Sequence, residues 1–127
     1  MFDANFYRMV LPETVRQACQ NQAEHVPVVE LHLPDSLTLD LCHIETLANT
    51  WLTVVYYRNP NEDNEVDRAF LPYQLVQWVT VSMHPPHVRH IGFDVARSVA
   101  AAIVVPAFAS PVVSPAPGTS PATPPAS

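Results

Sequence analysis

The apolar positions of the chain follow a helical spacing first and a strand-like alternation afterwards. In residues 11–24 apolar side chains recur at helical spacing, and Pro12 and Glu13 suit the first turn of a helix. From Val26 onward apolar residues alternate with polar ones through the segment VPVVELHLPDSLTLDLCHI. This alternation predicts two half-buried antiparallel strands that are joined by a turn at 34–36.

Three more strand-like runs follow. Residues 50–58 are rich in β-branched and aromatic side chains, and a polar loop at 59–67 separates them from runs at 68–73 and 75–83. Pro72 cannot donate a ladder hydrogen bond, so it predicts a bend between the last two runs. One helix and five short strands, with Leu, Val, Trp and Tyr facing inward, predict a mostly β fold, a strongly bent antiparallel small barrel.

The composition divides the chain into three parts. The helix and the barrel occupy 1–83, and 84–105 is predicted to be an irregular segment with a short apolar helix that Asp94 caps and that runs through Val104. The stretch 106–127 is rich in Pro, Ala and Ser and holds few large apolar residues, so we expect it to be disordered.

The charge balance and the cysteine count exclude several classes of protein. Twelve Asp and Glu residues oppose six arginines, no lysine occurs, and the formal net charge of −6 argues against a basic nucleic-acid binder. Two cysteines are too few for a disulfide scaffold. No apolar run reaches the ~20 residues of a membrane-spanning helix, and the N-terminus lacks a secretory signal pattern. We therefore expect a cytoplasmic protein without membrane contact.

Two short motifs within residues 12–83 give the chain a family resemblance. The second motif, FLPYQLV at 70–76, is matched loosely. The first has an acid at Glu45, an Asn at Asn49, and apolar residues at Val29, Leu31, Leu37, Leu41 and Ile44. Together with the order of one helix and five strands, these motifs resemble the Sm/LSm family, whose bacterial branch includes the Hfq-like RNA chaperones.

The resemblance implies an assembly and a ligand. Sm-like barrels leave strands four and five with open edges, which pair between neighbouring subunits to close a ring. The resemblance also implies RNA contact, for which Asn49, Tyr73 and Gln74 occupy the matching positions. Pro34 and Leu39 replace two glycines of the first motif, and the Arg-Gly or Lys-His pair of the second is absent. These departures weaken the case for RNA more than the case for the barrel.

The last strand-like run has the character of an interface strand. It is flat and apolar, without the lysines or inward charges that blunt an exposed sheet edge. We therefore expect a homo-oligomer, with an interface that contains Leu75, Val76, Trp78, Val79 and Val81. Because Trp51 and Trp78 lie in apolar strand runs, both are expected to be largely buried.

A group of histidines follows the last strand. His84, His87 and His90 are spaced by three, as are metal ligands on one face of a helix. Pro85 and Pro86 disfavour a regular helix there. We interpret the histidines as part of a surface turn and predict no metal site.

Other chemistry-bearing residues also favour structural interpretations. The polar loop 59–67 alternates oxygen-bearing side chains, but it lacks the Gly and the bidentate Glu of a calcium loop. Nucleophile elbows, Gly-rich phosphate loops and HExxH patterns are missing. We predict neither an enzyme nor a cofactor. His32 and His43, each in a strand, are expected to face solvent or a partner.

Three hypotheses of function follow from this sequence. The first is a non-enzymatic, oligomeric small-barrel protein that acts as a scaffold or protein-interaction module, with the apolar segment 99–108 available to a protein partner. The alternative is a divergent Sm-like RNA-binding chaperone, which the charge disfavours. The third is a small ligand-binding or catalytic barrel, and it requires Asp40, His43 and Glu45 to converge.

Overall fold

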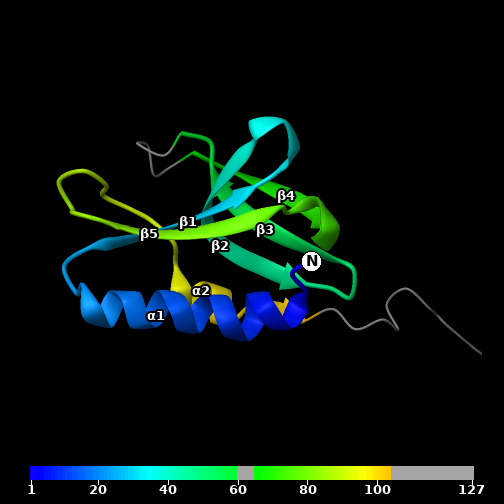
Figure 1. Cartoon of the computed structure of the whole chain (residues 1–127), viewed down its shortest axis with the longest axis horizontal. Coiled ribbons are helices and arrows are strands. Elements are labelled where there is room, and N and C mark those ends of the chain that lie inside the picture. The colour runs from blue at the N-terminus through cyan, green and yellow to red at the C-terminus, as the bar shows by residue number, and fades with distance from the viewer. Residues whose placement is uncertain (60–64, 104–127) are drawn as a thin grey trace, which may run out of the picture.

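The computed structural model describes residues 1–59 and 65–103, and it consists of an N-terminal helix packed against an antiparallel sheet (Figure 1). The disorder expected for 106–127, and half of the apolar segment 99–108, lie outside the described residues. The helices are a π-helical stretch at Phe6–Val10, α1 at Leu11–Asn21 and α2 at Val95–Val99. The strands are β1 (Val26–His32), β2 (Thr38–Leu47), β3 (Trp51–Tyr57), β4 (Val66–Pro72), β5 (Trp78–His84) and the short β6 (Ala102–Ile103).

The five long strands form one antiparallel sheet in the order β4-β3-β2-β1-β5, and β6 pairs in parallel with the end of β2. The prediction of one helix followed by five antiparallel strands is confirmed. The sheet is open and does not close into the predicted barrel, because β4 and β5 are not paired with each other in the described chain. Two 3-10 turns connect strands, one at Pro34–Ser36 and one at Tyr73–Leu75.

The second of these turns changes the boundaries of the last strand. The prediction started that strand at residue 75, but the Val76 N–H donates to the Tyr73 carbonyl at 3.2 Å and closes a turn there. The strand therefore begins at Trp78, and Leu75 and Val76 precede it. The predicted helix 11–24 also ends earlier, at Asn21.

The core lies between the helices and one face of the sheet. Tyr7, Leu11 and Val15 from the N-terminal helical region are buried there. They pack into one cluster with the inward-facing residues of the strands: Val29, Leu31, Leu41, Ile44, Leu47, Leu52, Val54 and Leu71. The alternation of apolar and polar residues in the sequence explains why these strand residues face the core.

The sheet splits between β1 and β2, and residues 85–94, which connect β5 to α2 and are called the returning segment, fill the split. β1 and β2 pair over only three residues each, 30–32 with 38–40. Beyond them the Phe93 N–H donates to the Pro27 carbonyl at 2.8 Å, and the Asp94 N–H donates to the Cys42 carbonyl at 2.7 Å. Figure 1 shows this segment turning back from β5 to α2 beside α1. The returning segment thus replaces the missing β1–β2 hydrogen bonds.

The returning segment runs so close to β1 that it needs a glycine. A Cβ on Gly92 would lie 1.9 Å from the Pro27 carbonyl oxygen, which no side chain tolerates. Two residues after Gly92, the Asp94 carboxylate accepts the Arg97 N–H at 3.0 Å, which is the predicted helix cap. The capped helix ends at Val99, earlier than the predicted Val104, because Ala102 and Ile103 pair as β6 with the end of β2.

Candidate functional site

β5 presents an open backbone edge. The Pro27 carbonyl points toward Phe93, so the odd-numbered residues of β1 direct their main-chain groups away from β5. Because hydrogen-bonded and non-hydrogen-bonded pairs alternate in an antiparallel ladder, the even-numbered residues of β5 direct their N–H and C=O groups to β1. Val79, Val81 and Met83 consequently direct their N–H and C=O groups to the outer edge, where no strand of the described chain meets them.

β4 presents a second open edge at the opposite end of the sheet. The Arg58 N–H donates to the Glu65 carbonyl at 2.9 Å, which directs the odd-numbered residues of this strand toward β3. Val66, Arg68 and Phe70 therefore direct their main-chain groups outward. The two strands that the resemblance implies as pairing edges are thus the two edge strands of the sheet.

The residues predicted for the oligomer interface have different positions at the β5 edge. Val79 and Val81 are half-buried against the core, and Val76 is buried within the turn that precedes the strand. The expected burial of Trp78 is wrong, since 51% of this residue is exposed. Its ring lies on the face opposite the core and stacks on His32, with 4.8 Å between ring centres.

The β4 edge carries an exposed aromatic residue that the sequence reasoning did not single out. Phe70 is 66% exposed, and its ring centre lies 5.9 Å from that of Trp51. Trp51 itself is half-buried, less than expected. Each open edge therefore carries one large exposed aromatic side chain, Phe70 or Trp78.

The residues that the resemblance assigns to RNA contact lie on two loops that meet. The Tyr73 N–H donates to the Thr50 carbonyl at 3.1 Å, which joins the β2–β3 loop to the turn before β5. Asn49 and Gln74 are exposed on these loops. Tyr73 is only 1% exposed, its hydroxyl donates to the Ala48 carbonyl at 2.5 Å, and burial raises its pKa. An enclosed ring offers no face on which a base can stack.

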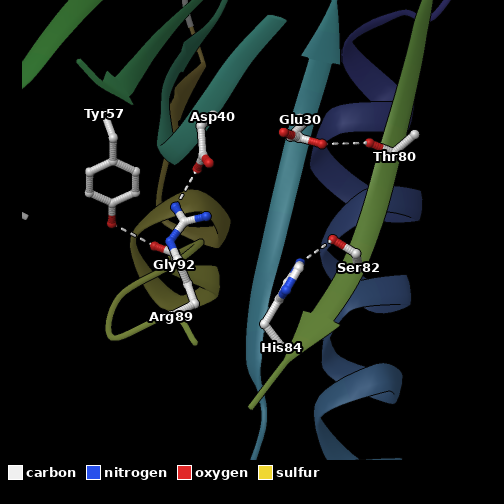
Figure 2. A network of polar contacts seen from close by, with 8 residues as sticks. All are labelled: Glu30, Asp40, Tyr57, Thr80, Ser82, His84, Arg89 and Gly92. Carbon is white, nitrogen blue, oxygen red and sulfur yellow. Dashed lines mark hydrogen bonds and ion pairs between the residues drawn. The ribbon is translucent and has the colours of Figure 1, made fainter. Parts of the chain in front are cut away.

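The histidine group that begins at the last residue of β5 does not assemble a metal site. His84 is hydrogen-bonded to Ser82, 3.0 Å from Nε2 to Oγ (Figure 2). His87 and His90 are exposed. Among residues 1–59 and 65–103, no group of three or more His, Cys, Asp or Glu side chains is arranged to hold a metal ion.

The face of the sheet opposite the core carries a buried ion pair that the sequence did not reveal. Arg89 donates from Nη2 to the Asp40 carboxylate at 2.7 Å, and the Tyr57 hydroxyl donates to the Gly92 carbonyl at 2.6 Å (Figure 2). The Arg89 guanidinium also lies 5.7 Å from the centre of the Tyr57 ring. These contacts hold the returning segment against β2 and β3.

A bulge in β2 places two consecutive residues on this outer face. Leu41 pairs with Tyr56 and His43 with Val55, so Cys42 is the extra residue. His43 is 6% exposed, which contradicts the expectation that it faces solvent or a partner. Burial, and next the positive charge of Arg97, lower its pKa.

The three residues required by the ligand-binding hypothesis are only partly brought together. His43 and Glu45 line the same pocket, but Asp40 is engaged by Arg89 and does not line it. The Glu45 carboxylate accepts two hydrogen bonds from Arg68, at 2.6 and 2.8 Å, and these lower its pKa.

Comparison of the chain with protein-family models, with curated proteins and with solved structures found no match. No helix in the described part of the chain is long and apolar enough to cross a membrane.

Proposed function

We propose that the chain is a subunit of a homo-oligomer with an Sm-like fold, and that it acts as a non-enzymatic scaffold or protein-interaction module. The observation that carries this proposal is the pair of open edges at the two ends of one sheet, β4 and β5. The strand order and the 3-10 turn before β5 support the resemblance on which the Sm-like assignment rests.

Head-to-tail pairing satisfies both edges of every subunit. If β5 paired with a second β5, each subunit would keep an open β4 edge, which is a template for further association. Pairing of β5 with the β4 of a neighbour uses both edges and closes into a ring when the rotation permits. We therefore favour the β4–β5 contact over a two-fold dimer.

The open edges select one antiparallel register. Two strands can form a ladder only if residues with outward main-chain groups on one strand lie opposite such residues on the other. Each of these pairs then exchanges two hydrogen bonds. One register makes three such pairs between subunits: Val79 with Phe70, Val81 with Arg68, and Met83 with Val66. Pro72, which has no N–H, then falls opposite Gln77, whose own N–H already donates to His32 at 2.8 Å. A shift by two residues in one direction would place Pro72, which has no N–H, opposite Val79. A shift in the other direction would place Phe70 opposite Gln77, whose N–H is already used, so either shift loses a hydrogen bond.

Light scattering coupled to size-exclusion chromatography tests the assembly. We expect the full chain at micromolar concentration to have a mass of more than two 14.1 kDa subunits. Val81→Pro removes an outward N–H and should give a folded monomer. The matched control Ser82→Pro removes an N–H that points to β1, so it should lower the free energy of unfolding instead.

Two results would contradict the proposal. A wild-type monomer at micromolar concentration would exclude an obligate assembly. A two-subunit mass, or an oligomer that Val81→Pro leaves intact, would exclude the pairing of β4 with β5.

A further inference from the structure

A pocket of about 350 Å³ opens on the outer face of the sheet, beneath the returning segment. Val55 and Val66 from β3 and β4 form an apolar floor, and Ile91 from the returning segment adds an apolar wall. His43 and Arg97 provide polar groups at the same pocket. Apolar walls with a few convergent polar groups, at this volume, are typical of sites for small organic ligands.

The walls of this pocket are fixed by buried contacts. The returning segment is anchored by the Arg89–Asp40 ion pair, in which both side chains are about nine-tenths buried. The Tyr57 hydroxyl and the Cys42 carbonyl hold the main chain of the same segment at Gly92 and Asp94. A rigid lining lowers the entropy cost of ordering the site when a ligand binds.

Of the two arginines that line the pocket, only Arg97 has no ion pair in the described chain. Arg68 is neutralised by two hydrogen bonds to Glu45. Arg97 forms no ion pair within the described chain, although the nearby Asp94 carboxylate accepts its main-chain N–H. His43 is buried beside it, with Nδ1 3.4 Å from the Cys42 sulfur. A guanidinium without a partner next to a buried imidazole favours an anionic group.

We propose that this pocket binds a small organic carboxylate, with the carboxylate on Arg97 and His43 and the apolar body on Val55, Val66 and Ile91. One guanidinium without an ion pair matches a single negative charge, and its planar fork matches a carboxylate. The site goes beyond the proposed scaffold function and does not depend on the pairing of β4 with β5.

The two free cysteines supply a direct readout of occupancy. Cys42 lines the pocket, whereas Cys19 lies on α1. Alkylation of the full chain by iodoacetamide is followed at each cysteine by peptide mass spectrometry, with benzoate as the carboxylate probe and benzamide as its neutral counterpart. At a benzoate concentration ten times its dissociation constant, mass action predicts about tenfold slower alkylation of Cys42. Cys19 should be unaffected, and benzamide should protect neither cysteine.

Two arginine variants separate the site from a general charge effect. Arg97→Gln should raise the dissociation constant of benzoate about tenfold, the loss expected for one charge-assisted hydrogen bond. The control Arg8→Gln removes an exposed arginine near the N-terminus and should leave binding unchanged. Equal protection by benzamide, unchanged affinity in Arg97→Gln, or the absence of protection by benzoate would each overturn the proposal. None of these outcomes bears on the oligomeric state.

Discussion

One extra residue in β2 decides what the outer face of the sheet presents. In a regular strand Cys42 and His43 would point to opposite faces. The bulge between Leu41 and His43 shifts the register, so that both residues line the outer pocket. A strict period of two contains no signal for such a bulge and would place His43 on the core face beside Leu41. The expectation that His43 faces solvent or a partner is wrong for another reason, because Ile91 and Arg97 lie over the same part of the outer face.

The buried Arg89–Asp40 pair is a second single-residue determinant, and it yields a stability prediction. Arg89→Met leaves the Asp40 carboxylate buried without a counter-charge, so we expect the free energy of unfolding to fall by about 3–5 kcal/mol. The double variant Arg89→Met, Asp40→Leu removes both charges and should recover most of that loss. Urea unfolding of the wild type and both variants measures the difference.

The double variant makes the outcome informative even where the single variant does not fold. If the double variant were as unstable as Arg89→Met, the effect would come from lost packing of the Arg89 side chain and not from an unpaired charge. If both variants matched the wild type, the ion pair would contribute nothing to stability.

Local pattern was sufficient for the strands but not for the contacts between distant segments. Alternation placed Leu31 and Leu41 in the core, as observed. Asp40 is buried because residues that lie more than forty positions later return to cover it. Trp78 is exposed because it shares the face opposite the core with His32. The burial of Asp40 and the exposure of Trp78 both depend on which part of the sheet the returning segment covers, and no local pattern encodes that choice. The edge strands were predictable, whereas the pocket was not.

The register proposed between β4 and β5 makes a prediction at the level of these two strands. Residues in a hydrogen-bonded antiparallel pair have Cα atoms about 5.5 Å apart, within the range of a disulfide. Phe70→Cys with Val79→Cys, in a background that lacks Cys19 and Cys42, should therefore crosslink neighbouring subunits on oxidation. Non-reducing electrophoresis should show a ladder of covalent oligomers.

A matched pair tests the register itself. Phe70→Cys with Met83→Cys displaces the second thiol by four residues, roughly 13 Å along the strand, which is too far to bridge. Equal ladders from both pairs would show that the strands slide or that another surface associates.

The charge of the whole molecule bears on the choice between self-association and RNA binding. Four of the six arginines form ion pairs with carboxylates of the same chain: Arg16 with Glu13, Arg58 with Asp67, Arg68 with Glu45, and Arg89 with Asp40. In the part of the chain that the structure describes, only Arg8 and Arg97 form none. A phosphate backbone is bound by clustered cations that release its counterions. Two separate arginines on a chain of net charge −6 do not form such a cluster.

We therefore expect no binding of single-stranded A-rich or U-rich RNA at micromolar protein and low salt. Fluorescence anisotropy with labelled RNA of each composition measures this directly, and a salt titration identifies any electrostatic contribution. Binding that weakens steeply with salt would contradict the expectation, because it would require a phosphate-binding surface. Asn49→Ala and Gln74→Ala would then locate that surface, since these are the exposed residues on the joined loops. If neither variant weakened such binding, RNA would contact a surface other than the one that the Sm-like resemblance implies.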